Sequence, residues 1–166
     1  MLKWIKRLAL LLLVLVVVAA GTGWWLLRGS VPRLEGELAL PGLSAPVSLQ
    51  RDANGVVTID AASDTDLARA LGYVHAQERY FEMDLMRRSS AGELSELFGA
   101  VALDMDKERR IHRMRARLMH DLPAFAGDKL PQLQAYTDGV NAGLADLKVR
   151  PWPYLVLRQQ PKLWEV

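Results

Sequence analysis

The chain has 166 residues, enough for one domain with a hydrophobic core and too few for two large ones. Its 21 basic and 19 acidic residues give a net charge of +2, but four basic residues lie in the first thirty positions, which leaves 17 basic and 19 acidic residues in the remainder. Such a balance excludes the basic surface that nucleic-acid binding needs. The lack of cysteine excludes a disulfide framework and a thiolate nucleophile.

An uncharged apolar run occupies residues 8–27, directly after three basic residues near the amino terminus. Its length is about what a helix needs to cross a bilayer. Residues 1–30 are therefore predicted to be a signal peptide or a signal anchor, with the basic end in the cytoplasm and the rest exported to the periplasm. Trp24 and Trp25 lie where an interfacial aromatic belt would fall, which favours an anchor in the inner membrane, whereas the small residues 19–21 leave cleavage open.

Short strands broken by turns are predicted after this leader, because prolines and glycines divide the sequence into brief alternating pieces. The expected strands are Gly36–Leu40, Val47–Gln50 and Val56–Asp60. Asn54-Gly55 between the last two is a typical hairpin turn.

A long helix is predicted from about residue 64 to 88. Ser63 with Asp66 three positions later forms a capping-box pattern, and apolar residues follow at helical spacing. The opposite face also carries apolar and aromatic residues, so the helix is expected to be buried in a larger body. Its charged groups must then be paired or reach water, because an unpaired buried charge costs several kcal/mol.

Further helices are predicted downstream. Glu93–Phe98 forms a short one, a longer one begins at Asp104 or Asp106 and is ended by Pro123, and the last covers about 129–147. The buried stripe expected for the last helix is Leu130, Leu133, Tyr136, Val140, Leu144 and Leu147. The apolar and aromatic residues of 152–164 are expected to contact a partner.

Three carboxylates on the long helix are candidates for general acid and base catalysis: Glu78, Glu82 and Asp84. That chemistry needs carboxylates that converge on one cleft with separated pKa values. Three arginines lie within pairing distance along the same helix: Arg79, Arg87 and Arg88. A structural network of ion pairs is therefore favoured over catalysis.

The other candidate groups have simpler interpretations. His75 is expected to be a hydrogen-bonded packing residue, and with His112 and His120 it shows no zinc-ligand spacing. Ser89 and Ser90 are expected to be capping residues at a helix end, because a hydrolase serine needs a strand-turn-helix elbow. The arginines of 109–117 are expected to form the solvated flank of an amphipathic helix, with binding to anionic lipid or another acidic partner as the alternative.

The order of five stretches resembles the amino-terminal part of the penicillin acylase family. They are RDANGVVTIDA, SDTDLARALGYVHAQERYFEMDLMRRSSAGELSELFG, LDMDKERR, LQAYTDGVNAGL and QPKLWEV, and the resemblance covers residues 31–166. Two local differences stand out: Glu78 replaces the aspartate usual in the family, and Gly55–Ile59 replaces a Gly-Val-Pro-His-Ile-like run. The Glu78 difference weakens a strict geometric role for that side chain.

The resemblance implies an exported amidohydrolase of the N-terminal nucleophile class, made as a precursor that cuts itself. A serine at the new amino terminus of the large β chain would be nucleophile and, through its α-amino group, general base, with an asparagine and a backbone N–H stabilising the oxyanion. The implied substrates are amides such as penicillins, cephalosporin side chains and N-acyl homoserine lactones. The implied partners are the rest of the small α chain and the β chain.

No residue of this chain matches the family's catalytic, substrate-binding or metal-binding positions, so none is predicted here; no cofactor is predicted for this chain, and calcium in the complete enzyme is left open. The predicted fold class is α+β and mostly helical: residues 31–166 as an incomplete α-chain region with a few short strands, preceded by one membrane-spanning or signal helix. The chain alone is predicted to be inactive. The alternative function is a membrane-anchored helical binding or scaffold protein without catalysis.

Overall fold

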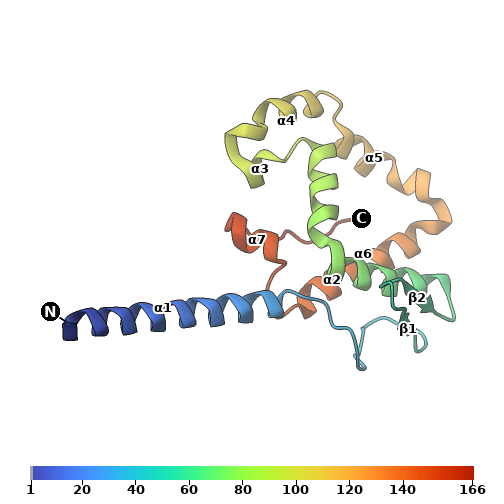
Figure 1. Ribbon diagram of the computed structural model, residues 1–166. Coiled ribbons are helices and arrows are strands. Elements are labelled where there is room, and N and C mark those ends of the chain that lie inside the picture. The colour runs from blue at the N-terminus through green and yellow to red at the C-terminus, as the bar shows by residue number, and fades with distance from the viewer. Residues whose placement is uncertain (1) are drawn as a thin grey trace.

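The computed structural model describes residues 2–166, and its first element is a long helix that projects from a mostly helical body (Figure 1). This helix, α1 (Leu2–Gly29), has a mean hydropathy of 2.4 in its most apolar window, and none of that window is buried against the body. It is long and apolar enough to cross a membrane, a test that signal sequences also pass. The predicted apolar helix is therefore present.

The two strands form one antiparallel hairpin, β1 (Ser48–Arg51) and β2 (Val57–Asp60), in which Ser48 pairs with Asp60 and Arg51 with Val57. In the turn, the Asp52 carboxylate accepts hydrogen bonds from the backbone N–H groups of Asn54 and Val56. The predicted hairpin is confirmed.

The strand predicted at Gly36–Leu40 is wrong, because this segment is a loop. Gly36 has a φ of +104°, which breaks the extended run. The carbonyl of Glu37 accepts a hydrogen bond from the Arg33 guanidinium instead of joining a ladder.

The long helix α2 (Asp64–Ala91) begins at the predicted cap, where the Ser63 hydroxyl accepts a hydrogen bond from the Asp66 N–H. It ends at Gly92, a left-handed residue whose N–H donates to the Arg88 carbonyl. Arg79 has non-helical dihedral angles (φ −144°, ψ 29°) and divides α2 into two segments that run in different directions (Figure 1). No pattern in the sequence predicts this kink.

The remaining helices are α3 (Ser95–Phe98), α4 (Leu103–Arg110), α5 (Met114–Ala126), α6 (Leu130–Asp146) and α7 (Trp152–Leu157), with short 3-10 turns η1 (Gly99–Ala102) and η2 (Gly127–Lys129). The single helix predicted up to Pro123 is wrong. Arg113 adopts a left-handed conformation (φ 52°) and separates α4 from α5, while Pro123 lies inside α5. That helix ends instead at Gly127, whose N–H donates to the Pro123 carbonyl.

The centre of the fold is the crossing of α2 with α6, where glycines bring the two backbones into contact. A methyl group added to Gly72 would overlap the carbonyl oxygen of Tyr136, and one added to Gly139 would overlap that of Arg69. Gly143 is similarly close to the Tyr73 carbonyl. Only glycine permits this approach, so these three positions fix how the two helices pack.

The buried face of α6 differs from the predicted stripe. Its buried residues are Ala135, Thr137, Gly139, Val140 and Gly143, so Val140 alone was predicted correctly as fully buried. Leu133 remains 39% exposed. Large apolar residues lie at the margins because the closely approaching helices leave room only for small side chains between them.

Candidate functional site

The most deeply buried polar group on α2 is the Asp84 carboxylate, the centre of a charge network. One oxygen accepts from Arg87 Nε at 2.7 Å, and the other accepts from Arg88 Nε at 2.8 Å and from the Tyr154 hydroxyl at 2.5 Å. Burial alone would raise the pKa of Asp84, but the hydrogen bonds from Tyr154, Arg88 and Arg87 outweigh it and hold the pKa below its ordinary value. Asp84 is therefore an ionised structural acceptor.

The network extends beyond α2 to three other parts of the chain. Arg88, only 2% exposed, also donates to Glu96 on α3 at 2.6 Å. Lys162, from the carboxyl-terminal segment, reaches the same Glu96 oxygen at 2.6 Å. Burial, and then the bond to Asp84, raises the pKa of Tyr154, so its hydroxyl stays protonated and donates. These contacts join α2, α3, α7 and the carboxyl-terminal segment.

The other two candidate carboxylates on α2 do not converge with Asp84. Glu78 pairs with Arg51 of β1, which ties the hairpin to the helix. None of the three helix arginines considered as partners pairs with Glu78: Arg87 and Arg88 bind Asp84, and Arg79 is exposed at the kink. Glu82 is also exposed, and within residues 2–166 neither it nor Arg79 forms an ion pair.

His75 is a packing residue, as predicted. Its Nδ1 lies 3.0 Å from the Tyr136 hydroxyl, and the two rings meet edge to face with centroids 5.9 Å apart. Burial, and then the charge of Arg79, lowers the pKa of His75. The imidazole is therefore neutral at pH 7 and joins α2 to α6 without a catalytic partner.

The serines and the arginine-rich stretch are also structural or solvated. Ser89 and Ser90 lie inside α2 and do not cap it, so the capping prediction is wrong; Ser90 donates back to the Met86 carbonyl at 3.0 Å. The arginines of 109–117 are all exposed, as predicted. The apolar residues between them, Ile111 and Met114, are exposed too.

Two aspartates each hold a loop by hydrogen bonds, a structural role that was not predicted from the sequence. Asp66 accepts from the Ser44 N–H at 2.9 Å and from its hydroxyl at 2.5 Å. Asp106 accepts from the N–H groups of Leu94 at 2.9 Å and Ser95 at 2.7 Å. Both carboxylates are buried, and an acid beside a turn or a helix start is the signal that could have identified them.

These buried carboxylates predict a loss of stability in acid. Hydrogen bonds from Ser44 lower the pKa of Asp66. At Asp106, burial acts to raise the pKa, but the hydrogen bonds from Ser95 and Leu94 outweigh it, so this pKa is lowered as well. Because the folded pKa values of these groups and of Asp84 lie below the unfolded value of 3.8, their stabilisation is complete above about pH 4 and disappears as the pH falls through the folded values. Denaturant midpoints measured from pH 6 to pH 2 should fall steeply below pH 4, and a flat profile would contradict the assignment.

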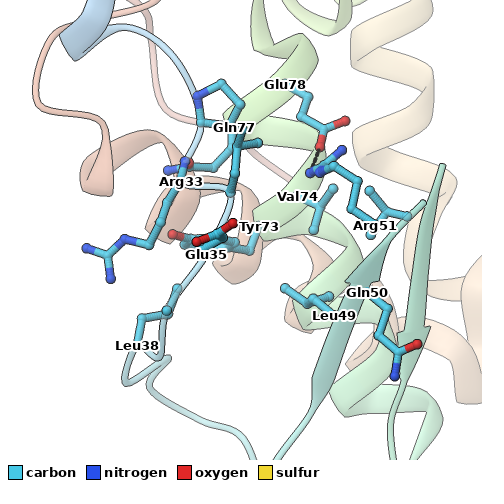
Figure 2. Close-up of a pocket in the computed structure, with 14 residues that line it drawn as sticks. Arg33, Glu35, Leu38, Leu49, Gln50, Arg51, Tyr73, Val74, Gln77 and Glu78 are labelled. Atoms are coloured by element: carbon cyan, nitrogen blue, oxygen red, sulfur yellow. Dashed lines mark hydrogen bonds and ion pairs between the residues drawn. The ribbon is translucent and has the colours of Figure 1, made fainter. Parts of the chain in front are cut away.

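A cavity of about 320 Å³ lies between the loop before β1, the hairpin and α2 (Figure 2). Several of its polar groups already have partners: Arg51 binds Glu78, and Gln77 accepts from the Arg33 N–H and donates to the Gly143 carbonyl. The Tyr73 hydroxyl donates to Asp146 at 2.7 Å, and burial, followed by that bond, raises its pKa. Glu35 also lines the cavity, but no histidine, serine, threonine or lysine among the lining residues could act with it as a base or nucleophile.

Metal ligands are not clustered in the described part of the chain. Within residues 2–166, no three His, Asp or Glu side chains gather around a common point. The buried carboxylates already face arginines or backbone N–H groups, which leaves no oxygen cage of the kind calcium needs. The described residues do not fit a calcium site of their own.

Comparisons with known proteins identify the class to which this fold belongs. The penicillin amidase family model matches residues 46–166. Penicillin acylase 2 proenzyme from Pseudomonas sp. (strain SE83) is 42% identical over 147 residues, 89% of this chain and 19% of that protein. Penicillin G acylase from Escherichia coli is 32% identical over 138 residues, 76% of this chain and 16% of that protein.

Two further relatives agree. Acyl-homoserine lactone acylase QuiP from Pseudomonas putida is 35% identical over 133 residues, 74% of this chain and 16% of that protein. The structure of the thermostable penicillin G acylase from Alcaligenes faecalis superposes with a TM-score of 0.63 at 29% identity, covering 72% of this chain and 65% of that one. The chain belongs to the penicillin amidase family. It spans less than a fifth of the length of the curated relatives it matches.

Proposed function

We propose that residues 31–166 are the amino-terminal scaffold of a penicillin-amidase-family precursor that hydrolyses the amide bonds of acylated small molecules. In this proposal the nucleophile and the oxyanion donors come from other parts of the precursor, the rest of the α chain and the β chain. The relatives suggest two substrate classes, β-lactam side-chain amides and N-acyl homoserine lactones. The mature region is exported and is tethered to the inner membrane through residues 8–27.

The main observation that supports the proposal is that each candidate group on α2 either binds a structural partner or is exposed to solvent. Asp84 is saturated by two arginines and Tyr154, Glu78 is bound to Arg51, and His75 is neutral against Tyr136. A general base must instead be free to take a proton from a reacting group within hydrogen-bond reach. The role left to this segment is to position other elements.

The contacts of the charge network support the scaffold role. Asp84 holds α7 through the hydroxyl of Tyr154 and also binds Arg88. The Asn141 side chain of α6 forms two hydrogen bonds with the Trp164 backbone, accepting from its N–H at 2.8 Å and donating to its carbonyl at 3.0 Å. Arg87 also lies over the Trp164 ring, 4.9 Å from its centroid. Tyr154 and Trp164 thus pack within the chain, which corrects the expectation that they await a partner; Trp152 and Leu163 remain exposed. The carboxyl-terminal segment is therefore held against α2 and α6.

A chimera tests the proposal. Residues 46–166 replace the matching segment of the Pseudomonas penicillin acylase 2 proenzyme, and chain processing and amide hydrolysis are measured. We expect the chimera to be processed and to hydrolyse the amides that the parent enzyme hydrolyses, because a scaffold segment needs only to reproduce packing. The 166-residue chain assayed alone is expected to be inactive on the same amides.

The chimera has a matched control in Gly139→Ala, which disrupts the helix crossing without touching any ionisable group. This variant should abolish processing and activity together. Hydrolysis by the isolated 166-residue chain would overturn the proposal, since it would require a nucleophile within these residues.

A further inference from the structure

The carboxyl end of α1 is docked on the body without a flexible linker. The Gly29 carbonyl accepts a hydrogen bond from the Val149 N–H at 2.9 Å, and a methyl group on Gly29 would lie 2.5 Å from a Val149 methyl carbon. Ser30 is buried directly after it. Three residues later, the Arg33 N–H is bound to Gln77 of α2. The direction of α1 is therefore set by the body.

This docking brings α7 close to the point where α1 leaves the body. Trp152, the first residue of α7, follows Val149 by three positions, and three residues span at most about 11 Å. Figure 1 shows α7 on the side of α2 from which α1 extends. If residues 8–27 cross a membrane, α7 lies near its periplasmic surface.

The exposed side of α7 has the composition of a membrane interface. Trp152 is 56% exposed and Val156 is 72% exposed, although Tyr154 between them is fully buried. Trp24 and Trp25, near the end of α1, are exposed as well. Tryptophans concentrate at the headgroup level of membranes because their rings combine apolar area with a polar N–H.

Basic residues lie at the same junction. Arg28, Arg33 and Lys148 line one groove of about 470 Å³ beside the end of α1, together with the acids Glu35 and Asp146. Asp146 is already bound to Tyr73 and lies 3.9 Å from Arg33. Arg28 and Lys148 are exposed and are in position to meet lipid phosphates.

We propose that α1 is retained as an uncleaved anchor and that the exposed face of α7, Trp152 and Val156, contacts the periplasmic leaflet of the membrane as a second attachment. The occupant of this face is thus lipid and not another protein. The inference rests on the proposed function only for the location of residues 8–27 in the membrane. It does not depend on amide hydrolysis.

The absence of native cysteine allows a direct test with single-cysteine variants of the full chain. Val156→Cys and Trp152→Cys carry an environment-sensitive fluorophore in vesicles of phosphatidylethanolamine and phosphatidylglycerol that contain a lipid-borne quencher. Phe125→Cys is the matched control: Phe125 is also apolar, is 91% exposed, and belongs to α5 on the other side of α2 (Figure 1). We expect about threefold or stronger quenching at position 156 than at position 125, since an interfacial helix buries its apolar face roughly 5–10 Å into the lipid boundary.

Two readouts accompany the quenching. Mass spectrometry of the chain extracted from bacterial membranes should find α1 intact, and a chain that starts near residue 21 in the soluble fraction would overturn the anchor. Equal, weak quenching at positions 156 and 125 in an intact, membrane-inserted chain would overturn the lipid contact. The lipid contact would also be overturned if position 156 were protected from an aqueous quencher but not quenched from the lipid, because that result would mean that protein covers the face. The chimera's hydrolysis assay is separate, so failure of either proposal is recognised independently.

Discussion

Replacing Gly139 with alanine is expected to lower the free energy of unfolding by about 3 kcal/mol. Helix propensity alone predicts the opposite sign, a gain of about 1 kcal/mol, because alanine is the better helix former. The structure predicts destabilisation, because the added methyl would overlap the carbonyl oxygen of Arg69, a backbone atom that cannot rotate away. Equilibrium unfolding of the full chain in detergent, followed by circular dichroism, measures the change.

The control for this substitution is Gly21→Ala. Gly21 also lies in a helix, but an added methyl there would meet nothing within 4 Å. It should be neutral or slightly stabilising, so the two variants separate packing from propensity. A stabilised Gly139→Ala variant would show that α2 and α6 do not approach each other as closely as described.

Replacing Asp84 with asparagine is expected to cost about 3–5 kcal/mol, the cost of breaking a buried ion pair from one side. Asparagine keeps the shape of the side chain but removes the charge that neutralises Arg88, which is almost completely buried. Glu96 then remains as its one ion-pair partner in the part of the chain that the structure describes. The same unfolding experiment measures the loss.

Asp104→Asn is the matched control for the charge network. Asp104 also pairs with a basic residue, Lys107, at 3.1 Å, but its side chain is 93% exposed. An exposed pair contributes roughly 0–1 kcal/mol, so this variant should unfold almost as the unsubstituted chain does. Equal effects at positions 84 and 104 would show that burial gives the Asp84 network no special weight in stability.

Large parts of the fold followed from local patterns in the sequence. The Ser63 cap, the hairpin around Asn54-Gly55 and the last long helix all have short-range signals, and each is present. The burial of a helix with paired charges was also predicted, because its apolar residues surround most of its circumference. In these cases the deciding interactions lie within a few residues along the chain.

The predictions failed where contacts between residues far apart in the sequence determine the structure. Arg51 comes from a strand 27 positions before Glu78, so the pattern of α2 alone suggested partners on the same helix. The buried face of α6 was missed because the prediction followed large apolar residues, whereas Ala135, Gly139 and Gly143 at four-residue spacing were the informative signal. The left-handed Arg113 has no local signal, since arginine rarely adopts this conformation.

The measurement that tests the scaffold role most directly is the turnover number of the processed chimera with Glu78→Gln or His75→Gln. If α2 is scaffold, each variant should retain a turnover number within about threefold of the unsubstituted chimera, because neither side chain takes part in proton transfer. Loss of a general acid or base typically slows turnover by about 100-fold or more. Such a drop, in a chimera that is still folded and processed, would place one of these residues in the chemistry and would contradict the scaffold role.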